Sequence, residues 1–266
     1  MRRKALIISI KGTKLSRIEK YILSQRTPWG VILFKRNIKT YDQVKHLLSS
    51  IRKITKDRKF PIMIDEEGKT VSRLKNVINN NISANFFGSV YEIDKVFGAK
   101  ILKHYLNSLT EILNDLGINI NTIPVLDVLR NYTSKVIGSR SFSKNPKITK
   151  ELGSLTIKHL HSKKIIGVIK HIPGHGAATL DSHKNMPKVK LSLKKLNNID
   201  LYPFKSSKAV LAMTAHILYT KLDKYNVATF SEKIINNVIR KKLGFKGIII
   251  SDDISMKALK FDLVTN

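Results

Sequence analysis

The residues best suited to chemistry lie between positions 170 and 183, directly after the apolar run 165–169. Residues 170–176 read KHIPGHG, and Asp181, Ser182 and His183 follow shortly. Proline and glycine interrupt regular structure, so this segment is predicted to be a loop that begins where a buried strand ends. A cation, three imidazoles and a carboxylate therefore gather at a strand end, which is where α/β proteins bind ligands.

Asp181 and His183 are two residues apart, so the carboxylate can reach the imidazole in an extended or turning loop. A carboxylate bonded to one ring nitrogen fixes the tautomer and raises the basicity of the other nitrogen. His183 is therefore a candidate general acid/base, with Asp181 as its partner. The alternative is a polar surface loop, but several histidines clustered at a strand end favour catalysis.

The same loop has the chemistry of a zinc site, since His171, His175 and His183 could act as ligands together with Asp181. The spacing of His171 and His175 would suit one face of a helix. Proline and glycine lie between them and oppose a helix, so we expect no metal here.

A second candidate is the acidic pair Asp252 and Asp253, which follows the apolar run 247–250 and Ser251. At a strand end, the first carboxylate can point into a barrel mouth. There it could act as a nucleophile, bind a metal or cap the following helix. Asp253 is the more natural cap or structural partner.

Five further polar residues are candidate ligand contacts because a carboxylate and several fixed donors suit the hydroxyl groups of a sugar. These are Asp65, Arg73, Arg140, Lys170 and His171. The alternative for each residue is a structural ion pair.

The elements that must position these residues alternate along the chain between apolar runs and segments of helical periodicity. The predicted strands are 5–10, 30–34, 61–64, 118–123, 165–169, 209–214 and 247–250, and the predicted helices are 15–24, 41–54, 94–116, 147–162 and 231–243. Alternation of this kind predicts an α/β fold with a parallel sheet, of the TIM (β/α)8-barrel type. Residues 1–266 form one predicted domain. Since a closed barrel needs eight strands, we expect a C-terminally truncated barrel of about seven, without the eighth strand and its helix.

The composition narrows the choice of partners. The 266 residues carry 49 Lys+Arg against 19 Asp+Glu, a net charge of +30, and no cysteine. No arginine-rich or aromatic-interleaved basic stripe supports nucleic-acid binding, although a basic binding protein remains an alternative. No stretch is long enough to span a membrane, and no signal-peptide cleavage site is evident, so a cytoplasmic location is expected.

Several ordered blocks of this sequence resemble the bacterial β-N-acetylglucosaminidases of glycoside hydrolase family 3, in the branch that recycles peptidoglycan. The blocks are GVILFKRN at 30–37, DEEG at 65–68 with Arg73, NTIPVLDV at 121–128, IGSRSF at 137–142, KHIPGHG at 170–176 with DSH at 181–183, and SDDISM at 251–256.

The resemblance implies a role for each matching residue. Asp252 would be the nucleophile that forms a covalent glycosyl–enzyme, and His183 the general acid/base with Asp181 as its dyad partner. Terminal N-acetylglucosamine would be held by Asp65, Arg73, Arg140, Lys170 and His171. The implied substrates are N-acetylglucosaminyl-anhydro-N-acetylmuramyl fragments, with no metal or organic cofactor. A phosphorylase that uses the same groups and an inactive truncated barrel both remain open, and the oligomeric state is not specified.

Two departures from the family pattern affect the predicted sugar contacts. The chain has Gly68-Lys69 where the family usually has two glycines, which leaves the backbone after Gly68 less free to turn. It has Gly138-Ser139-Arg140 where the family usually has Gly-Asp-Arg. We therefore expect Arg140 to lack an acidic partner.

Overall fold

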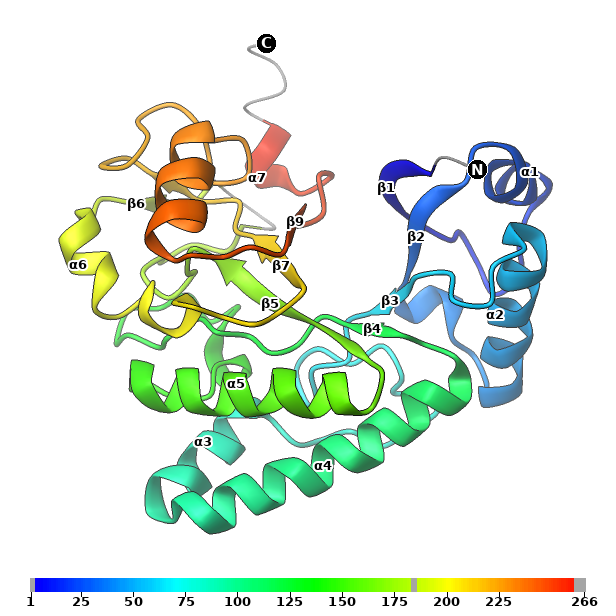
Figure 1. Cartoon of the computed structure of the whole chain (residues 1–266), viewed down its shortest axis with the longest axis horizontal. Coiled ribbons are helices and arrows are strands. Elements are labelled where there is room, and N and C mark those ends of the chain that lie inside the picture. Colours follow the sequence, from blue (N-terminus) through cyan, green and yellow to red (C-terminus); the bar gives the residue numbers. More distant parts are fainter. Residues whose placement is uncertain (1–2, 183–185, 261–266) are drawn as a thin grey trace.

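A parallel seven-stranded sheet organises the chain, in the order β1-β2-β3-β4-β5-β7-β9 (Figure 1). The computed structural model describes residues 3–182 and 186–260. The strands are β1 (Lys4–Ser9), β2 (Pro28–Leu33), β3 (Ile62–Ile64), β4 (Ile120–Asn121), β5 (Ile166–Ile172), β7 (Leu211–Thr214) and β9 (Ile248–Ser251). All seven strands predicted from apolar runs are confirmed.

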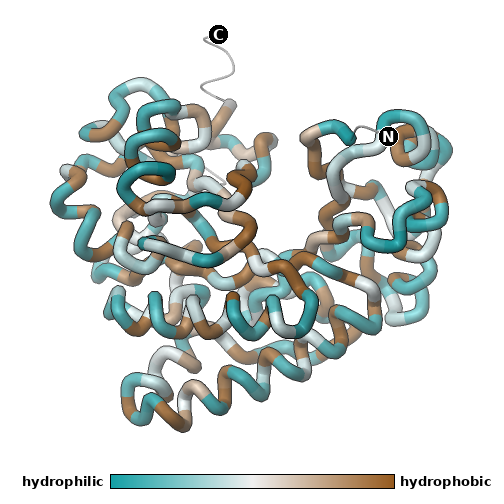
Figure 2. Tube along the Cα trace, viewed as in Figure 1, coloured by the Kyte–Doolittle hydropathy of each residue, from teal (hydrophilic) through white to brown (hydrophobic). Residues whose placement is uncertain are grey.

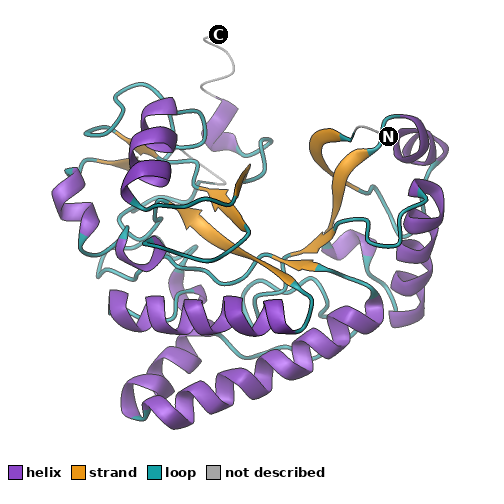
Figure 3. Cartoon of the chain, in the orientation of Figure 1, coloured by secondary structure: helices purple, strands orange, loops and turns teal. Residues whose placement is uncertain are grey.

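The sheet curls into part of a barrel and does not close over the described residues. Each strand pairs in parallel with the next in this order, and β1 and β9 are its two edge strands. Figure 3 shows the strands forming an arc with helices along its outer side. This arrangement agrees with the predicted seven-stranded α/β barrel.

Capping residues fix where the helices of this outer layer begin, and their apolar faces pack them against the core. Ser16 and Glu19 form a reciprocal capping box at the start of the first helix, and Asp94 accepts hydrogen bonds from the backbone of Val96 and Phe97. Hydrophobic and hydrophilic segments alternate along the helices in Figure 2, as expected for elements that cover a core on one side. The helices that correspond to the predicted ones are α1 (Arg17–Gln25), α2 (Tyr41–Thr55), α4 (Lys95–Leu116), α5 (Pro146–Ser162) and the π-type helix η4 (Ile234–Lys242).

Several elements were not predicted, and most of them are short. They are α3 (Ala84–Ile93), α6 (Leu193–Asn197), the 3-10 turns η1 (Lys35–Asn37), η2 (Gly138–Arg140) and η3 (Tyr202–Phe204), and the small parallel pair β6 (Lys188–Val189) and β8 (Leu218–Tyr219). The short helix α7 (Lys257–Lys260) begins where the sequence allows a seventh helix at 257–264, of which residues 261–264 lie outside the described residues. None of the helices in the described segments is both long and apolar enough to cross a membrane.

Strand β5 extends three residues further than the sequence predicted. Lys170 and His171 lie within β5, whereas they were expected in the loop after it. The prediction was wrong because polar residues were taken to end the strand. Their side chains are instead buried against carboxylates, so the strand continues through them.

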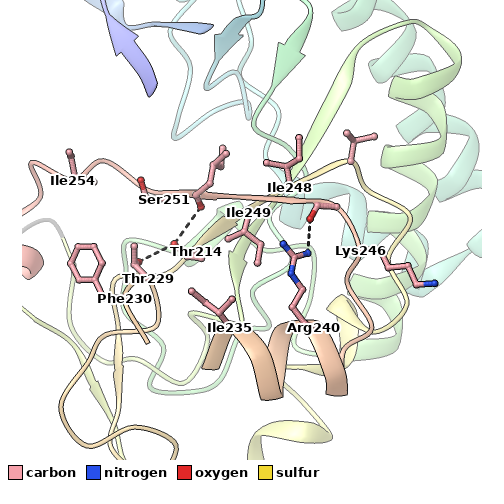
Figure 4. Close-up of a pocket in the computed structure, with 13 residues that line it drawn as sticks. Thr214, Thr229, Phe230, Ile235, Arg240, Lys246, Ile248, Ile249, Ser251 and Ile254 are labelled. Atoms are coloured by element: carbon pink, nitrogen blue, oxygen red, sulfur yellow. Dashed lines mark hydrogen bonds between the residues drawn. The ribbon is translucent and has the colours of Figure 1, made fainter. Parts of the chain in front are cut away.

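An apolar cleft of about 910 Å³ runs beside edge strand β9 (Figure 4). Its lining includes Val210, Phe230, Ile248 and Ile254, whose side chains are about half exposed. Thr214 and Thr229 supply hydroxyl groups at one end of this cleft. The end of β9 that carries Ser251 therefore borders both the cleft and the end of β7 that carries Thr214.

Candidate active site

A buried group of charges lies at the carboxyl ends of the central strands. Glu67, after β3, accepts two hydrogen bonds from the Arg140 guanidinium, at 2.7 Å and 2.9 Å. Lys170 of β5 places its Nζ 2.5 Å from the same carboxylate. Burial alone would raise the pKa of Glu67, but Arg140 and Lys170 outweigh it and lower that pKa to about 2. Glu67 is therefore a carboxylate that fixes two cations.

Asp65 lies beside this group and is more open to solvent. Its Oδ2 is 2.9 Å from the Arg73 guanidinium, its Oδ1 is 3.3 Å from Lys170 Nζ, and it also accepts from the Thr122 hydroxyl. Burial opposes ionisation, but Lys170 and Arg73 hold the pKa of Asp65 well below its usual range. The side chains of Asp65 and Arg73 are 14% and 29% exposed, against 5% for Glu67. Asp65 and Arg73 are thus the most open members of this group and the easiest for a sugar hydroxyl to reach.

Glu66 holds the loop that carries Arg73. Its buried carboxylate accepts hydrogen bonds from the Ser72 hydroxyl, the backbone N–H groups of Arg73 and Leu74, and the Asn80 amide. Gly68 nearby has a φ of 122°, where an added Cβ would meet the carbonyl oxygen of Ile82. One glycine is therefore enough for this turn, although Lys69 stands where the family has a second.

Asp127 orients the two histidines of the KHIPGHG segment. Its Oδ2 is 2.6 Å from His171 Nδ1, and its Oδ1 accepts the backbone N–H of His175 at 2.5 Å. Asp127 is fully buried; burial would raise its pKa, but His171 lowers it on balance. The hydrogen bond between Asp127 and His171 Nδ1 holds the His171 ring in one orientation. It therefore also sets the direction of the other ring nitrogen, Nε2.

His175 is a buried imidazole of a different kind. Its side chain packs edge-on against His171, with ring centroids 5.7 Å apart, and neither ring nitrogen has a hydrogen-bond partner within the described residues. Burial lowers the pKa of His175 to about 4, with Asp127 only partly opposing this shift. The ring is therefore neutral at physiological pH.

The acidic pair after β9 divides into two roles. Asp253 accepts from the backbone N–H and hydroxyl of Ser255, at 2.8 Å and 2.7 Å, and so starts the turn that leads into α7. Asp252 accepts the N–H of Asp253 at 2.8 Å through Oδ1. Asp253 is thus the structural member, as its position suggested, and the role of Asp252 as the nucleophile stays a prediction.

The structure describes only one member of the predicted acid/base pair, Asp181 and His183. Asp181 lies in the described chain beside buried Ser182, whereas His183 lies outside the described residues. The general acid/base assignment therefore stays a prediction. Among the side chains that the structure describes, no cluster of three or more His, Cys, Asp or Glu could hold a metal ion.

The structure brings five of the predicted sugar contacts into one region and adds three residues that the sequence analysis did not assign. Asp65, Arg73, Arg140 and Lys170 are linked through Glu67 and Thr122, and His171, which follows Lys170 in the chain, is held by Asp127. The expectation that Arg140 lacks an acidic partner is wrong, because Glu67 pairs with it. Ser139 lies instead 3.0 Å from the Thr70 hydroxyl. Glu67 and Asp127 both stand at strand ends within the quoted motifs, which was the available signal.

A cluster of this kind can bind a neutral polyhydroxylated ring. Paired charges keep their donors and acceptors in fixed directions, and each hydroxyl of a sugar can both donate and accept. Asp252, from a strand two places away in the sheet, could then supply a carboxylate near the bound ring. Asp252 is also close enough to the buried His216 to raise its pKa, against the larger lowering effect of burial.

The chain is similar to known proteins over almost its whole length. Residues 4–264 match the glycosyl hydrolase family 3 N-terminal domain. The chain is 33% identical over 260 residues to a β-hexosaminidase of Alkalilimnicola ehrlichii, covering 95% of this chain and 73% of that protein. It is 31% identical to β-hexosaminidase A of Pseudoalteromonas piscicida, covering 90% of this chain but only 43% of that longer relative.

Solved structures show the same likeness in three dimensions. NagZ from Neisseria gonorrhoeae, in complex with N-trifluoroacetyl-D-glucosamine, superposes with a TM-score of 0.87 at 31% identity, covering 95% of this chain and 75% of that one. A β-N-acetylglucosaminidase from Paenibacillus sp. str. FPU-7 gives a TM-score of 0.89 at 26% identity, covering 97% and 49%. On these matches, the chain belongs to glycosyl hydrolase family 3.

Proposed function

We propose that this chain is a retaining exo-β-N-acetylglucosaminidase that removes terminal N-acetylglucosamine from peptidoglycan fragments in the cytoplasm. The observation that carries the proposal is the group of fixed charges at Asp65, Arg73 and Lys170, with Asp252 directly after β9, which is two places from β5 in the sheet. Relatives named as β-hexosaminidases, and the Neisseria structure with an N-acylated glucosamine, support the substrate class. The domain would be the single half-barrel of residues 1–266.

In the proposed mechanism, Asp252 attacks the anomeric carbon while His183 protonates the departing oxygen. The bond from sugar to leaving group breaks as the bond to Asp252 forms, which gives a covalent glycosyl–enzyme. His183, now neutral, removes a proton from water, and water releases the sugar with its original configuration. Asp181 would orient the His183 ring. No metal or organic cofactor takes part in these steps.

The sugar contacts would act before and during this step. Asp65 would accept from a sugar hydroxyl while Arg73 and Lys170 donate to others. Glu67 would hold Arg140 and Lys170 in place by offsetting the repulsion between their two positive charges. Because these groups are already paired and fixed, little reorganisation would be needed when the sugar binds.

The test is release of nitrophenol from 4-nitrophenyl N-acetyl-β-D-glucosaminide, with 4-nitrophenyl β-D-glucoside as the matched control. We expect turnover of the first and little of the second, and proton NMR should show the β-anomer of N-acetylglucosamine as the first product. Release of the α-anomer would exclude retention. Acceleration by phosphate, with sugar 1-phosphate as product, would make the chain a phosphorylase instead. An absence of any turnover would contradict the proposal.

A further inference from the structure

His216 lies at the carboxyl end of β7 and takes no part in the steps above. Its side chain is almost completely buried, with 1% of the residue exposed. Nδ1 is 2.7 Å from the Thr229 hydroxyl oxygen, and Nε2 is 3.2 Å from the backbone carbonyl oxygen of Asp253. The ring therefore joins the turn that contains Thr229 to the residue that follows Asp252.

The chemistry of these partners assigns the proton on the ring. A carbonyl oxygen can only accept, so Nε2 must carry the proton and donate to Asp253. A neutral imidazole then has an acceptor at Nδ1, and the Thr229 hydroxyl must donate to it. Burial lowers the pKa of His216, with the Asp252 charge only partly opposing this, which agrees with a neutral ring.

Thr214 extends the chain of hydrogen bonds back into the sheet. Its hydroxyl oxygen is 3.0 Å from that of Thr229 and 3.4 Å from the carbonyl oxygen of Ile250 in β9 (Figure 4). Since Thr229 gives its proton to His216, Thr214 can give its single hydroxyl proton to Thr229, which is closer than the competing carbonyl oxygen of Ile250. The three side chains, Thr214, Thr229 and His216, thus form a directed relay that ends on the backbone after Asp252.

Asp253 is the point where this relay meets the proposed nucleophile. Its carbonyl oxygen accepts from His216 and, at 3.1 Å, from the N–H of Met256. Its own N–H donates to Asp252 Oδ1. Moving the Asp253 backbone would therefore move the donor that holds the Asp252 carboxylate.

We propose that His216 is a positioning residue that, with Thr229, fixes the Asp253 backbone and through it the direction of the Asp252 carboxylate. This inference rests on the proposed function for its consequence in catalysis, but the relay itself can be measured without turnover. A histidine that only fills the core would stabilise the fold without setting the position of residues 252–256.

The first test reads the relay directly by nitrogen NMR of the histidine rings and by amide hydrogen exchange. We expect His216 in the Nε2–H tautomer, and Thr229→Val, unlike Thr229→Ser, should shift its Nδ1 resonance. His216→Ala should speed exchange at Asp253 and Met256 at least several-fold, with little change in the distant helix α2. An Nδ1–H tautomer, or unchanged exchange at both residues, would overturn the proposal whether or not the chain is active.

The second test separates positioning from sugar binding. His216→Ala should lower kcat by about 10²-fold, as a displaced reacting group does, while the Kd for N-acetylglucosamine stays within about two-fold. His216→Gln places an amide N–H at about the reach of Nε2 and should recover part of kcat. Equal losses in kcat and sugar affinity, or no rescue by glutamine in a folded protein, would contradict positioning. Wild-type inactivity would refute the glycosidase proposal, and the NMR result would then still decide the relay.

Discussion

Glu67 and Arg140 form a bidentate pair at 2.7 Å and 2.9 Å, although they are 73 residues apart in the sequence. Lys170 approaches the same carboxylate, so one buried anion holds two of the proposed sugar-binding cations. This relationship explains how a loop between β4 and α5 is fixed against strands β3 and β5. It also provides the acid that Ser139 does not supply to Arg140.

Glu67→Gln is expected to destabilise the fold strongly, because it leaves two buried cations without their shared charge. Loss of one partner of a buried pair typically costs about 3–5 kcal/mol in the free energy of unfolding. Urea denaturation measures this change. Glu151→Gln is the matched control, since Glu151 pairs with Lys95 at 3.5 Å on the surface and should cost about 1 kcal/mol or less. Similar losses for both variants would contradict the role given to Glu67.

The pH dependence of stability should report His175. Its pKa is lowered from 6.5 to about 4 by burial, so the unfolded chain binds more protons between these values. Its contribution is therefore complete above pH 6.5 and falls by about 3 kcal/mol as the pH drops to 4. Urea denaturation at a series of pH values between 4 and 6.5 measures the free energy of unfolding. This free energy should change less with pH in His175→Asn than in the wild type. The difference between the two proteins isolates His175, because His216 and the carboxylates titrate in both.

The acidic pair after β9 allows a closely matched comparison. Asp252→Asn should lower kcat by on the order of 10³-fold or more, since an amide is a poor nucleophile, with little change in the melting temperature. Asp253→Asn should cost about 1 kcal/mol of stability through its weakened bonds to Ser255, and should leave most of kcat. Initial rates and thermal melts measure both effects. Reversed roles would require a new assignment of the nucleophile.

His183→Ala should slow the cleavage of a substrate more strongly when its leaving group needs a proton. A nitrophenolate leaves readily without a proton, whereas an alkyl or sugar alcohol does not, so kcat/KM should fall further for the second group. Kinetics on a series of aryl and alkyl N-acetyl-β-D-glucosaminides measures this dependence. An equal loss across the series would mean that His183 does not act as the acid.

The sequence predicted the sheet well because short apolar runs between helical segments mark buried parallel strands. It predicted Asp65, Arg73, Arg140, Lys170 and His171 as a group because they lie in motifs at strand ends. It could not identify Glu67 as the anchor, because Asp65, Glu66 and Glu67 are three consecutive acids with similar chemistry. Only their directions in the fold separate them: Asp65 faces the open site, Glu66 holds the Arg73 loop, and Glu67 meets Arg140.

Two further features were not predicted because they depend on contacts between distant parts of the chain: the length of β5 and the role of His216. Lys170 and His171 were expected in a loop, because the local sequence does not show that two distant carboxylates bind their side chains. These are Glu67, after β3, and Asp127, after β4. His216 was assigned no role from the sequence. Its relay joins Thr214, Thr229 and Asp253, and no sequence spacing reveals that these groups meet.

The proposed function depends on a covalent bond between the Asp252 carboxylate and the anomeric carbon of the sugar. The most direct measurement is peptide mass spectrometry after incubation with 2-acetamido-2-deoxy-5-fluoro-β-D-glucopyranosyl fluoride, which slows release of the glycosyl–enzyme. We expect one added 5-fluoro-N-acetylglucosaminyl group on Asp252, and none in Asp252→Asn. An adduct on another carboxylate, or substrate turnover without any adduct on Asp252, would contradict the account.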